Sequence, residues 1–75
     1  MPKKIRELKA MLLKAGFTYT SAKGSHTVWS HPLLLDSLTL SGKDGADADR
    51  YQEKYVRNAL IEIKHLEEED KGEHE

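Results

Sequence analysis

The chain has 75 residues, a formal net charge of −1 and no cysteine. This length provides one small domain with a single core, and the absence of cysteine excludes disulfides, zinc–thiolate sites and thiol nucleophiles. The basic, amphipathic start is unlike a signal peptide, and no apolar stretch approaches the roughly 20 residues of a bilayer span. We therefore expect a cytoplasmic protein that makes no contact with a membrane.

The small net charge hides an uneven distribution along the chain. Residues 1–66 carry 11 Lys and Arg against 7 Asp and Glu, whereas residues 67–75 carry one lysine against six acids. The first part is mildly basic, and local basicity favours binding of a polyanion. A solvated helix face followed by an acidic, solubilising tail explains the same charges.

The first predicted element is an amphipathic helix over residues 3–15. Ile5, Leu8 and Leu12 recur at three- and four-residue spacing, which is the period of one helix face. Gly16 follows and can adopt the left-handed conformation that ends a helix. Lys4 and Lys9 lie away from most of the apolar stripe, so they can stay hydrated or face a ligand.

Residues 17–21 and 26–31 alternate in polarity and predict a β-hairpin whose turn is residues 22–25. Gly24 lets the backbone turn tightly, and Lys23 places a positive charge at the bend. His26 then stands at the first position of the second strand. Histidine has an unperturbed pKa of about 6.5, so both protonation states are accessible near neutral pH. A cation, backbone N–H groups and an imidazole in one turn suit a phosphodiester ligand.

The second strand carries a large apolar residue on each face, so its period does not decide which face is buried. Trp29 and His31 share the face opposite to that of His26. Pro32 ends this strand because it cannot donate a ladder hydrogen bond. Residues 37–41 predict a third strand whose leucines face inward.

Residues 41–49 form the one long loop, and its aspartates invite comparison with a calcium-binding loop. The spacing lacks the glycine and the glutamate of an EF-hand, so we predict no metal site. Asp49 and Gln52 are spaced as a capping box that starts a second helix over residues 50–69. The acidic tail, residues 70–75, is polar and we expect it to fray.

The order helix, three antiparallel strands, helix predicts an α+β fold of the double-stranded-RNA-binding type, with both helices on one face of the sheet. In this order, four short motifs resemble the HicA toxins, which are bacterial mRNA interferases of toxin–antitoxin systems. The motifs are Gly16-Phe17, Lys23-Gly24-Ser25-His26, His31-Pro32 and Ser41-Gly42. The resemblance covers about residues 3–66, and we assign residues 1–69 to a single HicA-like domain.

The resemblance implies cleavage of mRNA by one essential histidine and neutralisation by a HicB-like antitoxin in a hetero-oligomer. The histidine corresponds to His26, and the turn that presents it corresponds to Gly24 and Ser25. The chain departs from the family in three places, one of which is the added acidic tail. Thr27 stands where many members have a second histidine, and the loop over residues 41–50 is longer and more acidic than in common members.

A histidine can serve as general acid or base when the 2′-hydroxyl of RNA attacks the adjacent phosphate. We expect His26 to have this role without a cofactor, while Lys23 and the turn amides bind phosphate oxygens. Lys4 and Lys9 would extend the RNA-binding surface. His31 is a candidate for the second acid–base group, but alternation places it on the other face of the strand from His26, which favours a role as a rim residue before Pro32.

Two other interpretations fit the same residues. His26 can be a turn residue that is hydrogen-bonded to the hairpin backbone, and the chain can be a small RNA-binding module that never cleaves. An interaction domain without a nucleic-acid role is less consistent with the basic first helix and the Lys23–His26 turn.

The partner surface is predicted from apolar residues around the second strand. Trp29 and Tyr19 either stack on bases or belong to the core or to a partner contact. Three consecutive leucines, residues 33–35, exceed what so short a connection can bury. We expect Leu34 and Leu35, together with Trp29, to contact the antitoxin. The alternative is that the leucines fold back under the sheet as a satellite core.

Overall fold

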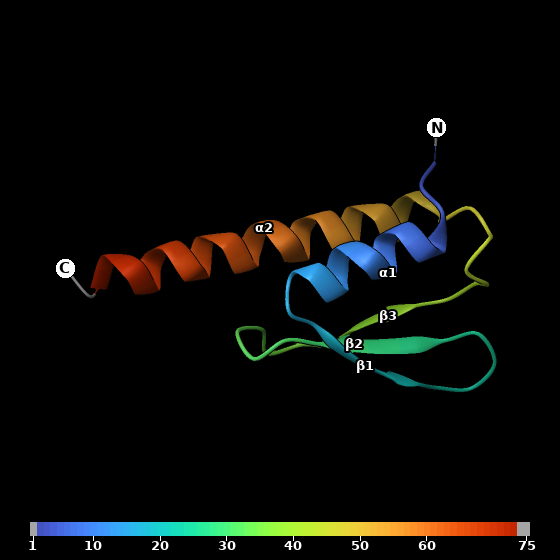
Figure 1. The fold of residues 1–75 in the computed structure, drawn as a ribbon, viewed down its shortest axis with the longest axis horizontal. Coiled ribbons are helices and arrows are strands. Elements are labelled where there is room, and N and C mark those ends of the chain that lie inside the picture. The colour runs from blue at the N-terminus through green and yellow to red at the C-terminus, as the bar shows by residue number, and fades with distance from the viewer. Residues whose placement is uncertain (1, 74–75) are drawn as a thin grey trace.

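The computed structural model describes the backbone of residues 2–73 and the side chains of residues 2–69. Two helices lie side by side on one face of a three-stranded sheet (Figure 1). In chain order the elements are α1 (Ile5–Lys14), β1 (Thr18–Ser21), β2 (Thr27–Ser30), β3 (Leu38–Leu40) and α2 (Arg50–Glu73). The predicted α+β layout, helix, three antiparallel strands and helix, is confirmed.

The sheet is antiparallel with the order β1-β2-β3, so β2 is the central strand and β1 and β3 are edges. Trp29 stands in the middle of β2, opposite Tyr19 of β1 and Leu38 of β3. Because residues directly opposite each other share a face, these three side chains lie on one face of the sheet. Trp29 is 0% exposed, so this is the face that the helices cover.

The core forms between the helices and this inner face of the sheet. Helix α1 contributes its predicted stripe, and α2 contributes Val56 and Ile63. Trp29 and Leu40 complete the core from the sheet. Full burial of one such apolar side chain contributes about 1.5–3 kcal/mol relative to exposure. The helical and strand periods read from the sequence thus lead to one shared core.

The acidic loop between β3 and α2 is held against the start of α1. The first N–H groups of a helix have no partner within that helix. Here the Ile5 N–H donates to the Ala46 carbonyl at 2.9 Å, and the Arg6 N–H donates to the Asp44 carbonyl at 3.1 Å. The loop backbone therefore caps α1.

Helix α2 begins at Arg50 as expected, but the predicted capping box is wrong. Gln52 is 2% exposed, and its Oε1 accepts a hydrogen bond from the Ser41 N–H at 2.9 Å. The Gln52 side chain points into the domain and ties the end of β3 to α2, so it does not reach back to Asp49. The helical backbone continues to Glu73, whereas the expected end was residue 69.

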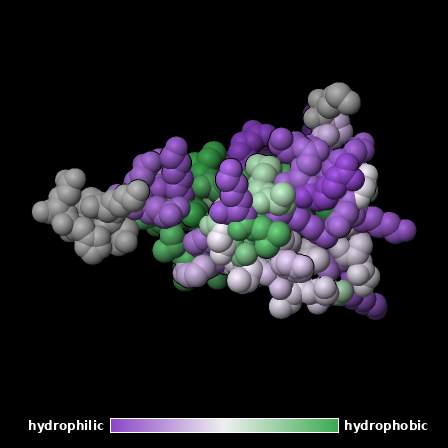
Figure 2. Space-filling view, viewed as in Figure 1, coloured by the Kyte–Doolittle hydropathy of each residue, from purple (hydrophilic) through white to green (hydrophobic). Residues whose placement is uncertain are grey.

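The expected fraying of residues 70–75 stays a prediction, and residues 74 and 75 lie outside the described part of the chain. Within residues 2–73, no helix has both the length and the apolar character that crossing a bilayer requires. Figure 2 shows hydrophobic surface beside α2, near the connection from β2 to β3, and more hydrophilic surface around α1.

Candidate functional site

The hairpin turn between β1 and β2 presents His26 on a fixed backbone. Gly24 has a φ of +66°, a left-handed conformation that glycine adopts without steric cost. The His26 N–H donates to the Lys23 carbonyl at 3.3 Å, and the Ala22 N–H donates to the His26 carbonyl at 2.8 Å. His26 is thus the last residue of the turn, immediately before β2, and its backbone is bonded on both sides.

The imidazole of His26 is oriented by the same turn. Its Nδ1 lies 3.0 Å from the Lys23 carbonyl oxygen. A carbonyl oxygen only accepts hydrogen bonds, so Nδ1 carries the proton and Nε2 holds the free lone pair of the neutral ring. The side chain is exposed. This geometry leaves Nε2 as the nitrogen that can take a proton from a ligand.

Ser25 joins the turn to the loop that follows β3. Its Oγ accepts a hydrogen bond from the Gly42 N–H at 3.0 Å. Gly42 has a φ of +116°, and a Cβ at this position would lie 3.3 Å from Cγ1 of Ile5. Glycine is required here because the loop passes close to α1. The His26 turn, the loop and the start of α1 therefore form one connected unit.

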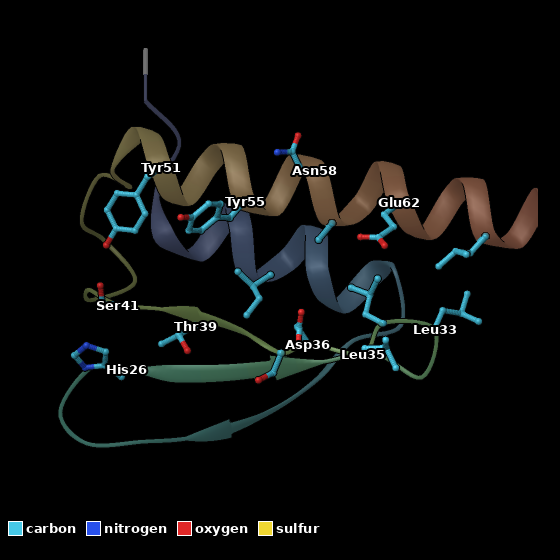
Figure 3. A pocket seen from close by; sticks show the side chains of 15 residues that line it. His26, Leu33, Leu35, Asp36, Thr39, Ser41, Tyr51, Tyr55, Asn58 and Glu62 are labelled. Atoms are coloured by element: carbon cyan, nitrogen blue, oxygen red, sulfur yellow. The ribbon is translucent and has the colours of Figure 1, made fainter.

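His26 lies at one end of a groove of about 920 Å³ between β3 and α2. Thr39 and Ser41 line this end from the sheet, and Tyr51 and Tyr55 line it from α2. Figure 3 shows both tyrosine rings on the side of α2 that faces β3, with His26 across from Tyr51. The groove gives an extended ligand access to the imidazole.

The other end of the groove is lined by the leucines of the connection from β2 to β3. Leu35 is 104% exposed and Leu33 is 43% exposed, whereas Leu34 is half-buried and packs against the core. The satellite-core interpretation thus holds for Leu34, and Leu35 remains available to a partner. Asp36 and Glu62 make this end acidic as well as apolar.

Trp29 does not belong to an accessible surface, so its predicted contact with a partner or a base is wrong. The side chain is fully buried, and its Nε1–H donates to Thr27 Oγ1 at 2.8 Å. Tyr19 stacks on it with ring centroids 4.6 Å apart. The reason is topological, because the middle strand directs this residue under the helices.

The two predicted RNA-binding lysines of the first helical segment are engaged in ion pairs. Lys4 Nζ lies 2.6 Å from Asp47 Oδ1, and Lys9 Nζ lies 2.7 Å from Asp44 Oδ1. Neither lysine lines the groove that contains His26. Both of these lysines are therefore paired with carboxylates, whereas Lys23 is exposed in the turn.

His31 has a structural role. Its Nε2 donates to the Ala15 carbonyl at 3.1 Å, and its Nδ1 accepts from the Leu33 N–H at 3.1 Å. Both ring nitrogens are used to hold the end of α1 against the exit of β2, and His31 does not line the groove. It is therefore not the second acid–base group that the sequence suggested as a candidate.

The sequence analysis missed the α2 side of the groove. Tyr51, Tyr55 and Asn58 line the groove from α2. They stand at positions i, i+4 and i+7 of this helix, beside its buried stripe. The sequence signal that could have revealed this side of the groove was a pair of aromatic residues at i, i+4 spacing next to an apolar stripe. In the described part of the chain, no three His, Asp or Glu side chains are grouped so that they could hold a metal ion.

A comparison with protein families gives a match over residues 5–66 to the HicA toxin of bacterial toxin–antitoxin systems. This chain belongs to the HicA toxin family. The resemblance inferred from the turn, strands and helices is confirmed, and the match spans α1 through most of α2. Neither the curated proteins nor the solved structures contained a match. As a HicA toxin, the protein is one half of a toxin–antitoxin pair.

Proposed function

We propose that this HicA toxin is an endoribonuclease that cleaves mRNA in the cytoplasm, with His26 as general acid–base. The observation that carries the proposal is the orientation of the imidazole. Its Nδ1 is bonded to the Lys23 carbonyl, so Nε2 is free to accept a proton at the end of an open groove. Family membership supports the assignment as a toxin, and the geometry of His26 supports acid–base cleavage of RNA as its activity.

In the proposed reaction, the 2′-hydroxyl of one nucleotide attacks the adjacent phosphorus atom. Nε2 of His26 takes the hydroxyl proton as the new P–O2′ bond forms. The bond from phosphorus to the 5′-oxygen of the next nucleotide breaks, and that oxygen takes a proton from a solvent water molecule. The products are a 2′,3′-cyclic phosphate and a 5′-hydroxyl. General acid–base catalysis of this kind contributes typically about 10²–10⁴-fold, and the route needs neither a metal ion nor a cofactor.

The turn also supplies groups for the phosphate. The N–H groups of Gly24 and Ser25 donate to no acceptor among the described residues, and Lys23 is exposed beside them. Successive free amides in a turn form a concave anion site, and donors aimed at developing negative charge stabilise a transition state. We propose that Lys23, Gly24 and Ser25 bind the non-bridging oxygens of the scissile phosphate.

The test is cleavage of single-stranded RNA by purified protein and by His26→Ala, with circular dichroism to check the fold. We expect the variant to be inactive and folded. His65→Ala is the matched control, because His65 is an exposed histidine on α2 outside the groove. DNA of the same sequence should stay intact since it lacks the nucleophile. Cleavage by His26→Ala at the wild-type rate would refute the proposal.

One alternative function is compatible with the same hydrogen bond between His26 and its own turn, a small RNA-binding module that does not cleave. In that case His26 only shapes the turn, and its replacement would weaken RNA binding with no cleavage to lose. Measuring RNA affinity beside cleavage for the same variant separates the two functions.

For the partner, we propose a HicB-like antitoxin that forms a hetero-oligomer with this protein and occupies the leucine end of the groove. Leu35 is fully exposed there, and apolar surface of this kind is typical of protein contacts. A protein seated on these leucines would extend along the groove toward His26 and exclude RNA by steric occlusion.

A further inference from the structure

The two ends of the groove differ in chemistry. The end that contains His26 is lined by hydroxyl and phenol groups, from Thr39, Ser41, Tyr51 and Tyr55 (Figure 3). The opposite end is lined by leucines together with two carboxylates. A polyanion is repelled by the carboxylates, so the aromatic end is the one suited to RNA.

The two tyrosines at this end are accessible to a ligand. Tyr51 is 52% exposed and Tyr55 is 57% exposed. Their rings contact each other edge to face, with centroids 5.8 Å apart and planes at 76°. An edge-to-face pair leaves ring faces uncovered. Exposed aromatic faces are the platform on which proteins stack unpaired bases, because every base has a π-face.

Positive charge accompanies the aromatic pair. Lys54 is exposed and lies three residues after Tyr51 and four before Asn58, so it is a neighbour of both on the helix surface. Lys23 contributes charge from the turn across the groove. A phosphodiester backbone can thus follow the cations while a base enters between α2 and β3.

We propose that Tyr51 and Tyr55 form a subsite for one unpaired nucleobase of the RNA, next to the phosphate that reacts at His26. The tyrosines hold the base by stacking on its face. The inference rests on the proposed function and names its substrate class as single-stranded RNA, since a paired base cannot enter.

The experiment measures binding of a 2′-O-methyl RNA oligomer, which lacks the nucleophile and stays intact. One nucleotide in turn is replaced by the fluorescent base 2-aminopurine, or by an abasic unit that keeps the phosphate. Wild-type protein should quench the 2-aminopurine signal at one position. Tyr55→Ala should weaken binding by about 5- to 150-fold, the loss expected for one stacked base, and abolish the quenching.

Three controls isolate the base contact. Tyr55→Phe keeps the ring and should bind as wild type within about twofold. Ile61→Ala removes an exposed apolar side chain of α2 outside the groove and should change nothing. The oligomer that is abasic at the quenched position should bind wild type and Tyr55→Ala equally. Tyr51→Ala and Tyr55→Ala variants that bind the intact oligomer like wild type would overturn the subsite, as would an equal loss for the abasic oligomer.

The outcomes separate the subsite from the proposed function. Tyrosine-dependent binding without cleavage of ordinary RNA would refute the nuclease and support the subsite. Cleavage of ordinary RNA with tyrosine-independent binding would support the nuclease and refute the subsite. Absence of any RNA binding would refute both.

Discussion

Replacing Lys23 by alanine should lower the salt dependence of RNA binding, whereas replacing Lys9 should leave it unchanged. The two residues are both lysines, but their surroundings differ. Lys9 Nζ lies 2.7 Å from Asp44 Oδ1, and its side chain is 24% exposed. Lys23 is exposed in the turn beside His26 and forms no ion pair among the described residues. A lysine already paired with a carboxylate releases little counterion when RNA binds.

The size of the effect follows from counterion release. Each phosphate contact on a single strand adds about 0.7 to the slope of log affinity against log salt, so raising salt fourfold weakens binding about 2.6-fold for each contact. Lys23→Ala should therefore reduce the slope by about 0.7.

Fluorescence anisotropy with a labelled 2′-O-methyl RNA between 50 and 200 mM salt, about one fourfold step, measures these slopes. Lys9→Ala is the matched control for Lys23→Ala. A slope that falls as much for Lys9→Ala as for Lys23→Ala would refute the reasoning. It would mean that the ion pair with Asp44 opens when RNA binds, and that α1 belongs to the RNA-binding surface.

Three further predictions concern stability and the partner. Trp29→Ala should destabilise the domain by about 3–5 kcal/mol, a large part of the free energy of unfolding of about 5–15 kcal/mol that is usual for proteins. Thermal unfolding is followed by circular dichroism, and a curve that matches wild type would contradict the burial of Trp29. Gln52→Leu keeps the side-chain volume but leaves the Ser41 N–H without its acceptor, which should lower the free energy of unfolding by about 1–3 kcal/mol. Urea unfolding measures this loss, and an unchanged midpoint would show that water replaces the hydrogen bond. Leu35→Asp should spare stability and weaken antitoxin binding measured by calorimetry, whereas Leu34→Asp should also destabilise the free toxin. Unchanged antitoxin affinity for Leu35→Asp would place the antitoxin elsewhere.

Much of the fold could be predicted because its signals are local. The apolar period of α1, the glycine after it and the alternation on both sides of the Lys23–His26 turn depend on neighbouring residues only. For this reason the predicted boundaries of the helices and strands agree with the observed ones to within a few residues. At the start of α1 the cap comes from a distant segment, because the loop carbonyls of Ala46 and Asp44 bond the first turn.

The candidate site was predicted in part. The position of His26 in a glycine-containing turn is a local property, so the sequence placed it within one residue of the start of β2. Which face of β2 is buried was not a local property, because both faces carry an apolar residue. Trp29 was therefore assigned to a surface that the helices cover.

Taken alone, the sequence determined the order of the elements, the turn that carries His26 and the apolar face of each helix, because these follow from backbone preference and short-range period. The tertiary structure alone decided which lysines are held in ion pairs and which residues line the groove. Lys4 and Asp47 are 43 residues apart in the chain, and Lys9 and Asp44 are 35 apart. The groove likewise joins the turn before β2 to the flank of α2. Such pairings arise only when the helices pack on the sheet, since no local signal specifies which distant side chains then become neighbours.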